Sequence, residues 1–496
     1  MQDKSLKQSV IKGFLWKAVE NGGDQLITFV ISIVLARLLG PEKYGTMSVM
    51  LIFVTIANVI IQTGFQTALI QKKEVSEDDF SSVFWLGLLI SLILYGIIFI
   101  ISPVAASYFD DPEITPMLRA LSIVLFFGSV TSVLFAKVAR ELNFRLQCIA
   151  TVIADILSGV AGIIAAVKGA GTWALIIQQL LKNMILMLLL IVLLSWRPSF
   201  TFRMERIKSL FSYGWKVLVS GLIDTIYNNL YTPVIKKLYD PEMVGFYNRA
   251  NQFPQVIANS AAATMQAVLL PAFSKTQGSG NTEQANSRAI MRRTLKTGSY
   301  VMFPAMFGIM AVSESLVRVL LGDAWMGAVT LLRLCCLSYS VWHIHVANLQ
   351  AINANGRSDI YLKLEILKKI IGVLVLILSA KGGVTLMILM KALFDYVCTF
   401  INGWPNRKII GYSPLRQWRD IMPEFLSAGA MGIIAYLVRP LMLLAGVSGE
   451  NFGSALLIMA VQIIIGISVY IIVSLAFRLE SMRYLKETVL NLLKKR

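Results

Sequence analysis

The chain has 496 residues, of which 56% are hydrophobic and only 15% are charged, and its mean hydropathy is +0.68. Because soluble domains carry about 25% charged residues, this composition excludes an ordinary soluble protein and predicts a surface that faces lipid. The formal net charge of +18 would suit nucleic acid, but the positions of the charges, described below, give it another meaning.

The apolar residues gather into stretches that are each close to the ~20 residues a helix needs to cross a bilayer. Strands of a membrane barrel would be about half as long and would alternate in polarity. We therefore predict an all-α polytopic membrane protein with about fourteen transmembrane helices. In chain order the stretches are 14–38, 46–70, 82–107, 117–136, 148–167, 173–195, 213–238, 244–272, 292–312, 328–352, 361–380, 384–403, 424–446 and 453–477.

The second half of the chain repeats the first. The segment LLGPEKYG at 38–45 recurs as LYDPEMVG at 238–245, and the other pairs, in the same serial order, are Trp16-Lys17 with Trp215-Lys216, Leu118-Arg119 with Leu332-Arg333, and Lys168-Gly169 with Lys381-Gly382. A duplicated hydrophobic chain is typical of transporters built from two halves. We predict two six-helix bundles, residues 1–200 and 201–405, related by a pseudo-twofold axis along the membrane normal. Residues 406–496 would add two transmembrane helices and a basic cytoplasmic tail.

Charge predicts the orientation in the membrane. Most of the lysines and arginines fall at the two ends of the chain and in the even-numbered loops, as in Lys72-Lys73, whereas the loop at 110–113 is acidic. The positive-inside rule therefore places both termini in the cytoplasm, and the net charge is mostly topological. The tail at 478–496 reads as a basic amphipathic helix on the inner leaflet or as a simple topology anchor. We expect no cleavable signal peptide, because the first apolar run is interrupted by polar residues.

Polar side chains lie on one face of the first and seventh stretches, at spacings of three or four. A charge in a bilayer is costly, so such residues usually face a cavity. We predict that these two stripes line one water-filled central cavity, although the two lysines also suit a snorkelling position at the interface. The first stripe is Lys17, Asn21, Asp24 and Thr28, and the second is Lys216, Ser220, Asp224, Asn228 and Tyr231.

The eighth stretch contains Arg249 followed by Gln252, whereas its repeat partner has Val49 at the position of the arginine. Because guanidinium binds phosphate through two parallel hydrogen bonds, we predict that Arg249 contacts an anionic cargo; pairing with a carboxylate near the outer interface is the alternative. Further charges within spans are Lys182, Arg333, Lys391 and Asp395, each of which suits a structural role as well as a ligand contact. We place Lys182 and Arg333 in the predicted cavity. His343 and His345 are two residues apart and point to different sides of a helix, so we predict no metal site.

The chain resembles the Wzx-type lipopolysaccharide or colanic-acid-exporter-like flippases, which form a polysaccharide transporter family in the MATE/oligosaccharidyl-lipid (MOP) superfamily. The resemblance is strongest in the opening GFLWKAVENGGDQLITFVISIVLARLLGPEKYGTMSVM, in RELNFR at 140–145 and in GFYNRANQFP at 245–254. It covers the first twelve stretches. It implies two bundles around a cationic cleft that moves undecaprenyl-diphosphate-linked sugars across the bacterial cytoplasmic (inner) membrane. The family has no short universal motif, so the resemblance assigns no single site residue.

Together these patterns predict a flippase that exports a lipid-linked oligosaccharide by alternating access and is not an enzyme. No cofactor is expected, and Glu20, Asp24 and Asp224 are the candidates for coupling to H+ or Na+. Membrane lipids, a polysaccharide polymerase and glycosyltransferases are the expected partners. A cation-coupled multidrug exporter of the same superfamily is the alternative, although it would prefer an acidic cavity. A membrane-embedded polymerase or ligase is a further alternative that would need a larger external loop.

Overall fold

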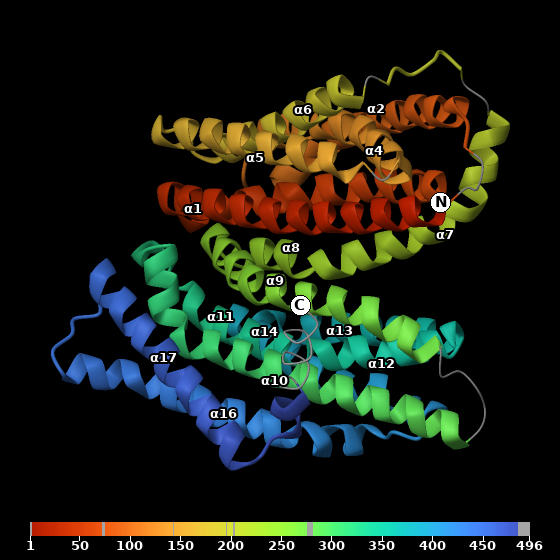
Figure 1. Cartoon of the computed structure of the whole chain (residues 1–496). Coiled ribbons are helices and arrows are strands. Elements are labelled where there is room, and N and C mark those ends of the chain that lie inside the picture. Colours follow the sequence, from red (N-terminus) through yellow and green to blue (C-terminus); the bar gives the residue numbers. More distant parts are fainter. Residues whose placement is uncertain are drawn as a thin grey trace. The chain divides into compact units, whose positions relative to one another are not determined.

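The computed structural model describes residues 2–71, 75–141, 143–194, 196–201, 204–274 and 281–484, and helices make up most of these ranges (Figure 1). Within them there is no β-strand, and ten helical segments are long and apolar enough to cross a membrane. This confirms the predicted all-α, multi-pass membrane fold. Two compact units are formed by Met1–Gly245 (unit 1) and Phe246–Arg496 (unit 2). The division at residues 200 and 405 stays a prediction.

Unit 1 is built around its first helix, α1, which packs against α4, α5 and α7, while α5 also packs against α6. Its elements are α1 (Gln2–Gln71), α2 (Glu77–Tyr108), α3 (Ile114–Leu121), α4 (Val124–Glu141), α5 (Phe144–Val167), α6 (Thr172–Leu194), α7 (Met204–Asn229) and α8 (Tyr231–Leu238). The next helix, α9 (Pro241–Ser274), begins in unit 1 and continues into unit 2.

Unit 2 is built around α10, which packs against α11, α16 and α17 (Figure 1). Its elements after α9 are α10 (Asn281–Leu320), η1 (Asp323–Trp325), α11 (Ala328–Ser340), α12 (Trp342–Ala354), α13 (Ser358–Ser379), η2 (Ala380–Gly382), α14 (Val384–Gly403), α15 (Asn406–Ile409), α16 (Pro414–Leu444) and α17 (Phe452–Ala476). The predicted tail at 478–496 lies mostly outside the described residues.

Several predicted stretches are not single straight helices. The first two are one continuous run, α1, which is interrupted at Gly40, whose φ of 73° is a conformation that glycine adopts without strain. The seventh is divided at Leu230 into α7 and α8, because Pro233 cannot donate to the Asn229 carbonyl and its ring clashes there. The fourth is divided into α3 and α4, and the tenth into α11 and α12.

Small residues let the helices of unit 1 approach closely. A Cβ atom on Gly159 of α5 would lie 2.2 Å from Ile31 Cδ1 of α1, and one on Gly162 would lie 2.9 Å from Gln178 Cβ of α6. Real Cβ atoms do not come this close to a neighbour. Since lipid gives apolar helices no hydrophobic reason to associate, such close packing supplies much of the attraction between them.

A buried amide network fastens the end of the second repeat to α16. Asn348 Nδ2 of α12 donates to Gln417 Oε1 of α16 at 2.8 Å, and Gln417 Nε2 donates back to Asn348 Oδ1 at 3.0 Å. Asn406 of α15 also donates to Asn348 Oδ1, at 2.8 Å. Because these side chains are buried, moving α16 away would remove both hydrogen bonds between Asn348 and Gln417 from a site that water does not reach.

Candidate functional site in the membrane-spanning helices

Three charged side chains from three helices meet inside unit 1. Lys182 Nζ of α6 lies 3.2 Å from Asp24 Oδ1 of α1 and 2.6 Å from Asp155 Oδ1 of α5. The close packing of α5 against α1 and α6 brings these side chains together although they are far apart in the sequence. Thr28 Oγ1, one turn after Asp24, lies 3.5 Å from the same Asp24 oxygen. We call Asp24, Asp155 and Lys182 the α1–α5–α6 ion cluster.

The three side chains of the ion cluster differ in exposure: Asp155 is buried, and Asp24 and Lys182 are partly exposed. The Asp155 side chain is 2% exposed, whereas those of Asp24 and Lys182 are 35% and 25% exposed. Two carboxylates share one ammonium, so the cluster has one net negative charge when all three groups are ionised. Among the described residues, Asp155 Oδ2 is buried without a hydrogen-bond partner. The arrangement can therefore accept a proton or a small cation, which would neutralise the remaining charge.

Sequence reasoning identified Asp24 and Lys182 but missed Asp155. The signal was present, because Asp155 is the only charged residue in the apolar run CIATVIADILSGV. A charge within such a run has to be paired or to face water. Asp155 also lies at helical spacing from the polar residues Gln147, Thr151 and Ser158 of α5, so the spacing that marked the other stripes was present here too.

The rest of the predicted cavity stripes is only partly described. The side chains of Lys17, Glu20, Asn21 and Lys216 lie outside the described residues. On α7, Asp224 and Asn228 are both exposed, one turn apart on one face of the helix. Helices α1 and α7 contact each other within unit 1, but whether the two stripes line one cavity stays a prediction.

Arg249 is buried in unit 2 with 5% of its surface exposed. Its Nη1 donates to Gln252 Oε1 at 2.6 Å, and its guanidinium carbon lies 6.0 Å from the centre of the Trp325 ring. Both predicted residues are thus brought together, and Trp325 joins them from η1. The equivalent position in the first repeat, Val49, is fully buried, so a core valine in one half corresponds to a buried cation in the other. Because Arg249 is enclosed in this conformation, contact with a cargo requires it to be uncovered.

Unit 2 has a charge cluster of its own on α14. Lys391 Nζ lies 2.9 Å from Asp395 Oδ2 and donates to Ser338 Oγ of α11 at 2.8 Å, and Ser338 in turn donates to Asp395. The offset that relates Lys168 to Lys381 places Asp395 opposite Lys182 in the repeat. The sixth span of each half therefore carries an ion cluster. This one is balanced, whereas the α1–α5–α6 cluster is not.

The remaining predicted residues are placed as follows. Arg333 lies on α11 and lines a separate pocket between α10 and α16, described below. His343 and His345 contact different helices, because their side chains bond to Ser299 of α10 at 2.7 Å and to Asn402 of α14 at 3.0 Å. The described residues contain no group of three or more metal-ligating side chains.

Solved structures with the same fold include a lipid II flippase, MurJ, in an inward closed conformation. It matches with a TM-score of 0.74 over 94% of this chain and 99% of its own, at 14% sequence identity. An inward-facing multidrug resistance MATE family transporter of the MOP superfamily matches with a TM-score of 0.60 over 78% of this chain and 94% of its own, at 15% identity. Identities this low show a shared fold and leave the cargo open.

Similar sequences come from bacterial polysaccharide assembly. A succinoglycan biosynthesis transport protein of Rhizobium meliloti is 26% identical over 67% of both chains. A teichuronic acid biosynthesis protein of Bacillus subtilis and a lipopolysaccharide biosynthesis protein of Escherichia coli are each 22% identical over 87% of this chain and 89% of theirs. A family model described as "Polysaccharide biosynthesis protein" matches residues 34–330, and because this is more than half of the sequence, the chain belongs to the polysaccharide biosynthesis protein family.

Proposed function

We propose that this protein moves a lipid-linked oligosaccharide, with a polyprenyl diphosphate carrier such as undecaprenyl diphosphate, across the bacterial cytoplasmic membrane for surface polysaccharide synthesis. The observation that carries the proposal is the similarity, over most of the chain, to transport and biosynthesis proteins for three different surface polysaccharides. The fold shared with a lipid II flippase supports it. The protein would act by alternating access and would not itself be an enzyme.

The binding of the carrier diphosphate is assigned to Arg249. A buried guanidinium where the first repeat has a core valine is a costly replacement, and a diphosphate supplies the anion that such a group can hold in low dielectric. Gln252 occupies the arginine in this conformation. A phosphate could replace Gln252 as the acceptor of this hydrogen bond. When the phosphate leaves, Gln252 would accept the bond again, so the guanidinium keeps a partner in both states.

Coupling to H+ or Na+ is assigned to the α1–α5–α6 ion cluster. Asp24 is its most exposed member and would be the entry point, while the buried oxygen of Asp155 would be the inner acceptor. A proton or cation bound at one carboxylate removes the net charge of the cluster. Lys182 is then attracted more strongly to the other carboxylate. The unbalanced charge supports this role. Glu20 and Asp224 remain further candidates.

The orientation is part of the proposal. Both termini would be cytoplasmic, with the acidic loop at 110–113 outside. Reporter fusions after residue 110 and after residue 290 should then report outside and inside, respectively. The opposite pattern would reverse the direction in which cargo reaches Arg249.

The decisive experiment compares lipid-linked sugars and drug resistance in cells that lack this protein. Deletion should cause lipid-linked oligosaccharide to accumulate in the inner leaflet and should abolish the surface polysaccharide, and the wild-type chain should restore both. Arg249→Ala should fail although it inserts normally, and Arg249→Lys should restore only part of the export because a point charge lacks the two-pronged geometry. Full export by Arg249→Ala would remove this residue from the mechanism.

A multidrug exporter is the second candidate, and the fold shared with a MATE transporter is the observation that favours it. Such an exporter would make the deletion strain sensitive to cationic drugs while its surface polysaccharide stayed normal. That outcome would reject the flippase proposal. Partners such as a polymerase and glycosyltransferases are expected only if the flippase proposal holds.

A further inference from the structure

An arginine and serine pair occurs at corresponding places in both repeats. In unit 1, Arg119 Nε donates to Ser102 Oγ at 2.9 Å, and in unit 2, Arg333 Nε donates to Ser313 Oγ at 2.8 Å. Each serine also donates to the carbonyl three residues before it, that of Phe99 in unit 1 and of Met310 in unit 2. The pair is therefore a repeated structural feature whose two copies can be compared directly.

The first copy makes two further contacts within its own bundle. Arg119 Nη2 donates to the Phe99 carbonyl oxygen at 3.3 Å, and the guanidinium carbon lies 3.8 Å from the centre of the Phe99 ring. The side chain thus joins α3 to α2 through two hydrogen bonds and a stacked ring. We take this copy as the structural version of the pair.

The second copy has lost these partners. Met310 replaces Phe99, and the guanidinium of Arg333 lies instead 5.3 Å from the ring of Tyr436, on a helix outside the repeat. Among the described residues, no carboxylate pairs with Arg333, and neither of its terminal nitrogens has a hydrogen-bond partner. A cation within a membrane span is costly without a counter-ion, and the terminal nitrogens of Arg333 are available to donate to an anion.

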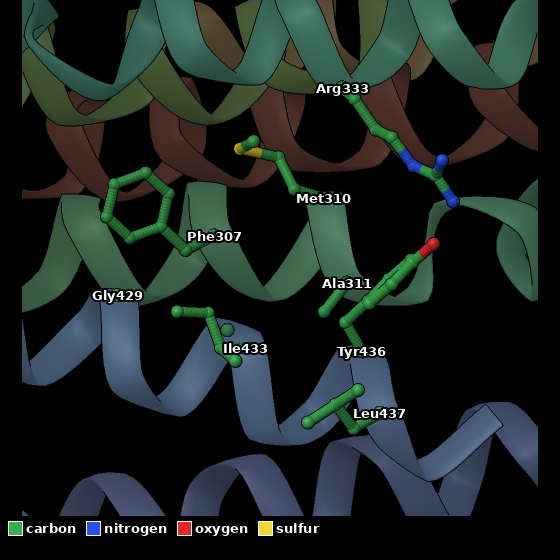
Figure 2. Close-up of a pocket in the computed structure, with 9 residues that line it drawn as sticks. Phe307, Met310, Ala311, Arg333, Gly429, Ile433, Tyr436 and Leu437 are labelled. Atoms are coloured by element: carbon green, nitrogen blue, oxygen red, sulfur yellow. The ribbon is translucent and has the colours of Figure 1, made fainter. Parts of the chain in front are cut away.

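The freed guanidinium stands at one end of an apolar pocket of about 420 Å³ between α10, α11 and α16. Figure 2 shows Arg333 and Tyr436 at that end, with Phe307 and Gly429 at the other. Apolar side chains form most of the rest of the wall. A Cβ atom on Gly429 would meet no heavy atom within 4 Å, so the space beside this glycine is open. A molecule that fits is apolar along its length and anionic at one end.

We propose that this pocket binds one anionic phospholipid of the surrounding membrane, with its phosphate on Arg333 and part of one hydrocarbon chain along α16. The volume lies at the small end of the ~300–1,000 Å³ typical of ligand pockets, which leaves room for part of one hydrocarbon chain. The wall has almost no hydrogen-bonding groups for sugars. On this proposal Arg333 serves a lipid site independent of the cargo, and its place in the central cavity stays a prediction. On the proposed orientation the start of α11 faces outside, so the lipid comes from the outer leaflet.

The test measures binding of phosphatidylglycerol and phosphatidylcholine to the purified full-length protein, by thermal unfolding in mixed micelles and by native mass spectrometry. A ligand that binds only the folded state raises the melting temperature with its concentration. Phosphatidylglycerol should stabilise the wild type more than phosphatidylcholine does. Arg333→Gln should weaken this binding by roughly tenfold or more, the expected loss for a charged hydrogen bond, and Arg333→Lys should keep part of it.

Matched variants separate the site from a general charge effect. Arg119→Gln makes the same charge change in the structural copy and should keep the phosphatidylglycerol preference, even if it melts earlier. Gly429→Leu fills the pocket with the charge intact and should lose that preference. Gly96→Leu, at a glycine of α2 whose Cβ would also be unobstructed, should keep it. If Arg333→Gln does not fold, Gly429→Leu still decides the question.

Several results would overturn the proposal. Unchanged phosphatidylglycerol preference in Gly429→Leu, or equal loss in Arg119→Gln, would show that the pocket is not the site. A full shift with glycerol phosphate alone would reveal a phosphate site without a hydrocarbon chain. Displacement of phosphatidylglycerol by undecaprenyl phosphate at lower concentration would assign the pocket to the cargo carrier.

Discussion

Gly45 of one repeated segment lies against Pro241 of the other: a Cβ atom on Gly45 would be 1.9 Å from the carbonyl oxygen of Pro241. The contact is reciprocal, since a Cβ atom on Gly245 would be 2.0 Å from the carbonyl oxygen of Pro41. These four residues belong to the two copies of the Pro-Glu-x-x-Gly segment. The repeat seen in the sequence is therefore also a crossing of two backbones that only glycine permits.

Alanine at either glycine should be destabilising. Gly45→Ala and Gly245→Ala each force a backbone carbonyl to move, and overpacking of this kind costs about 1–3 kcal/mol. Gly96→Ala is the matched control, because it adds the same methyl group to a helix with open space. Thermal unfolding in detergent measures the difference. Equal melting temperatures for Gly45→Ala and Gly96→Ala would show that this crossing is looser than described.

Removing the cation of the α1–α5–α6 ion cluster should be more damaging than removing one of its carboxylates. Lys182→Met leaves Asp155 buried without its counter-ion, and breaking a buried pair in this way costs about 3–5 kcal/mol. Asp155→Asn leaves the Lys182–Asp24 pair in place and should cost less. The double variant Lys182→Met/Asp155→Asn should recover part of the loss, since the two changes are coupled. Strict additivity in the measured unfolding free energies would contradict the shared cluster.

Water should reach the polar face of α7. Cysteine at 224 or 228, where the native side chains are exposed, should react with a membrane-impermeant thiol reagent in at least one transport state. Cysteine at 226 should resist, because the exposed Ile226 side chain belongs on a lipid-facing surface. The four native cysteines are buried and should contribute little background. If cysteines at 224 and 228 were as unreactive as the cysteine at 226, the water-filled cavity would be rejected.

Stability should depend on pH through Glu480, which follows α17. The hydrogen bond from Lys296 Nζ, with that from Arg292, holds the pKa of the Glu480 carboxyl below its ordinary value of 4.5, while partial burial opposes this. A lowered pKa means that the stabilisation is present above pH 4.5 and is lost as the pH falls through the folded-state value. The stability advantage of wild type over Glu480→Gln should therefore shrink in acid. It should also shrink at high salt, because the carboxylate is 46% exposed.

The sequence predicted the helical membrane fold well, because the length of an apolar stretch is a property of the chain itself. It did not predict the breaks at Leu230 and Val341, since an apolar stretch reads the same whether it is one helix or two. At the site it found Asp24 and Lys182 as separate charges. Their meeting depends on the glycines that draw α5 against α1 and α6. No local pattern contains that information.

The amide network around Asn348 has an evolutionary consequence. If a descendant lost the two helices after the second repeat, Asn348 would lose both of its hydrogen bonds with Gln417 and keep only those with Ile344 and Asn406. A gene shortened in this way would favour a residue at 348 that does not need Gln417 as a partner. The length of the chain and the identity of one residue within the repeat are therefore inherited together.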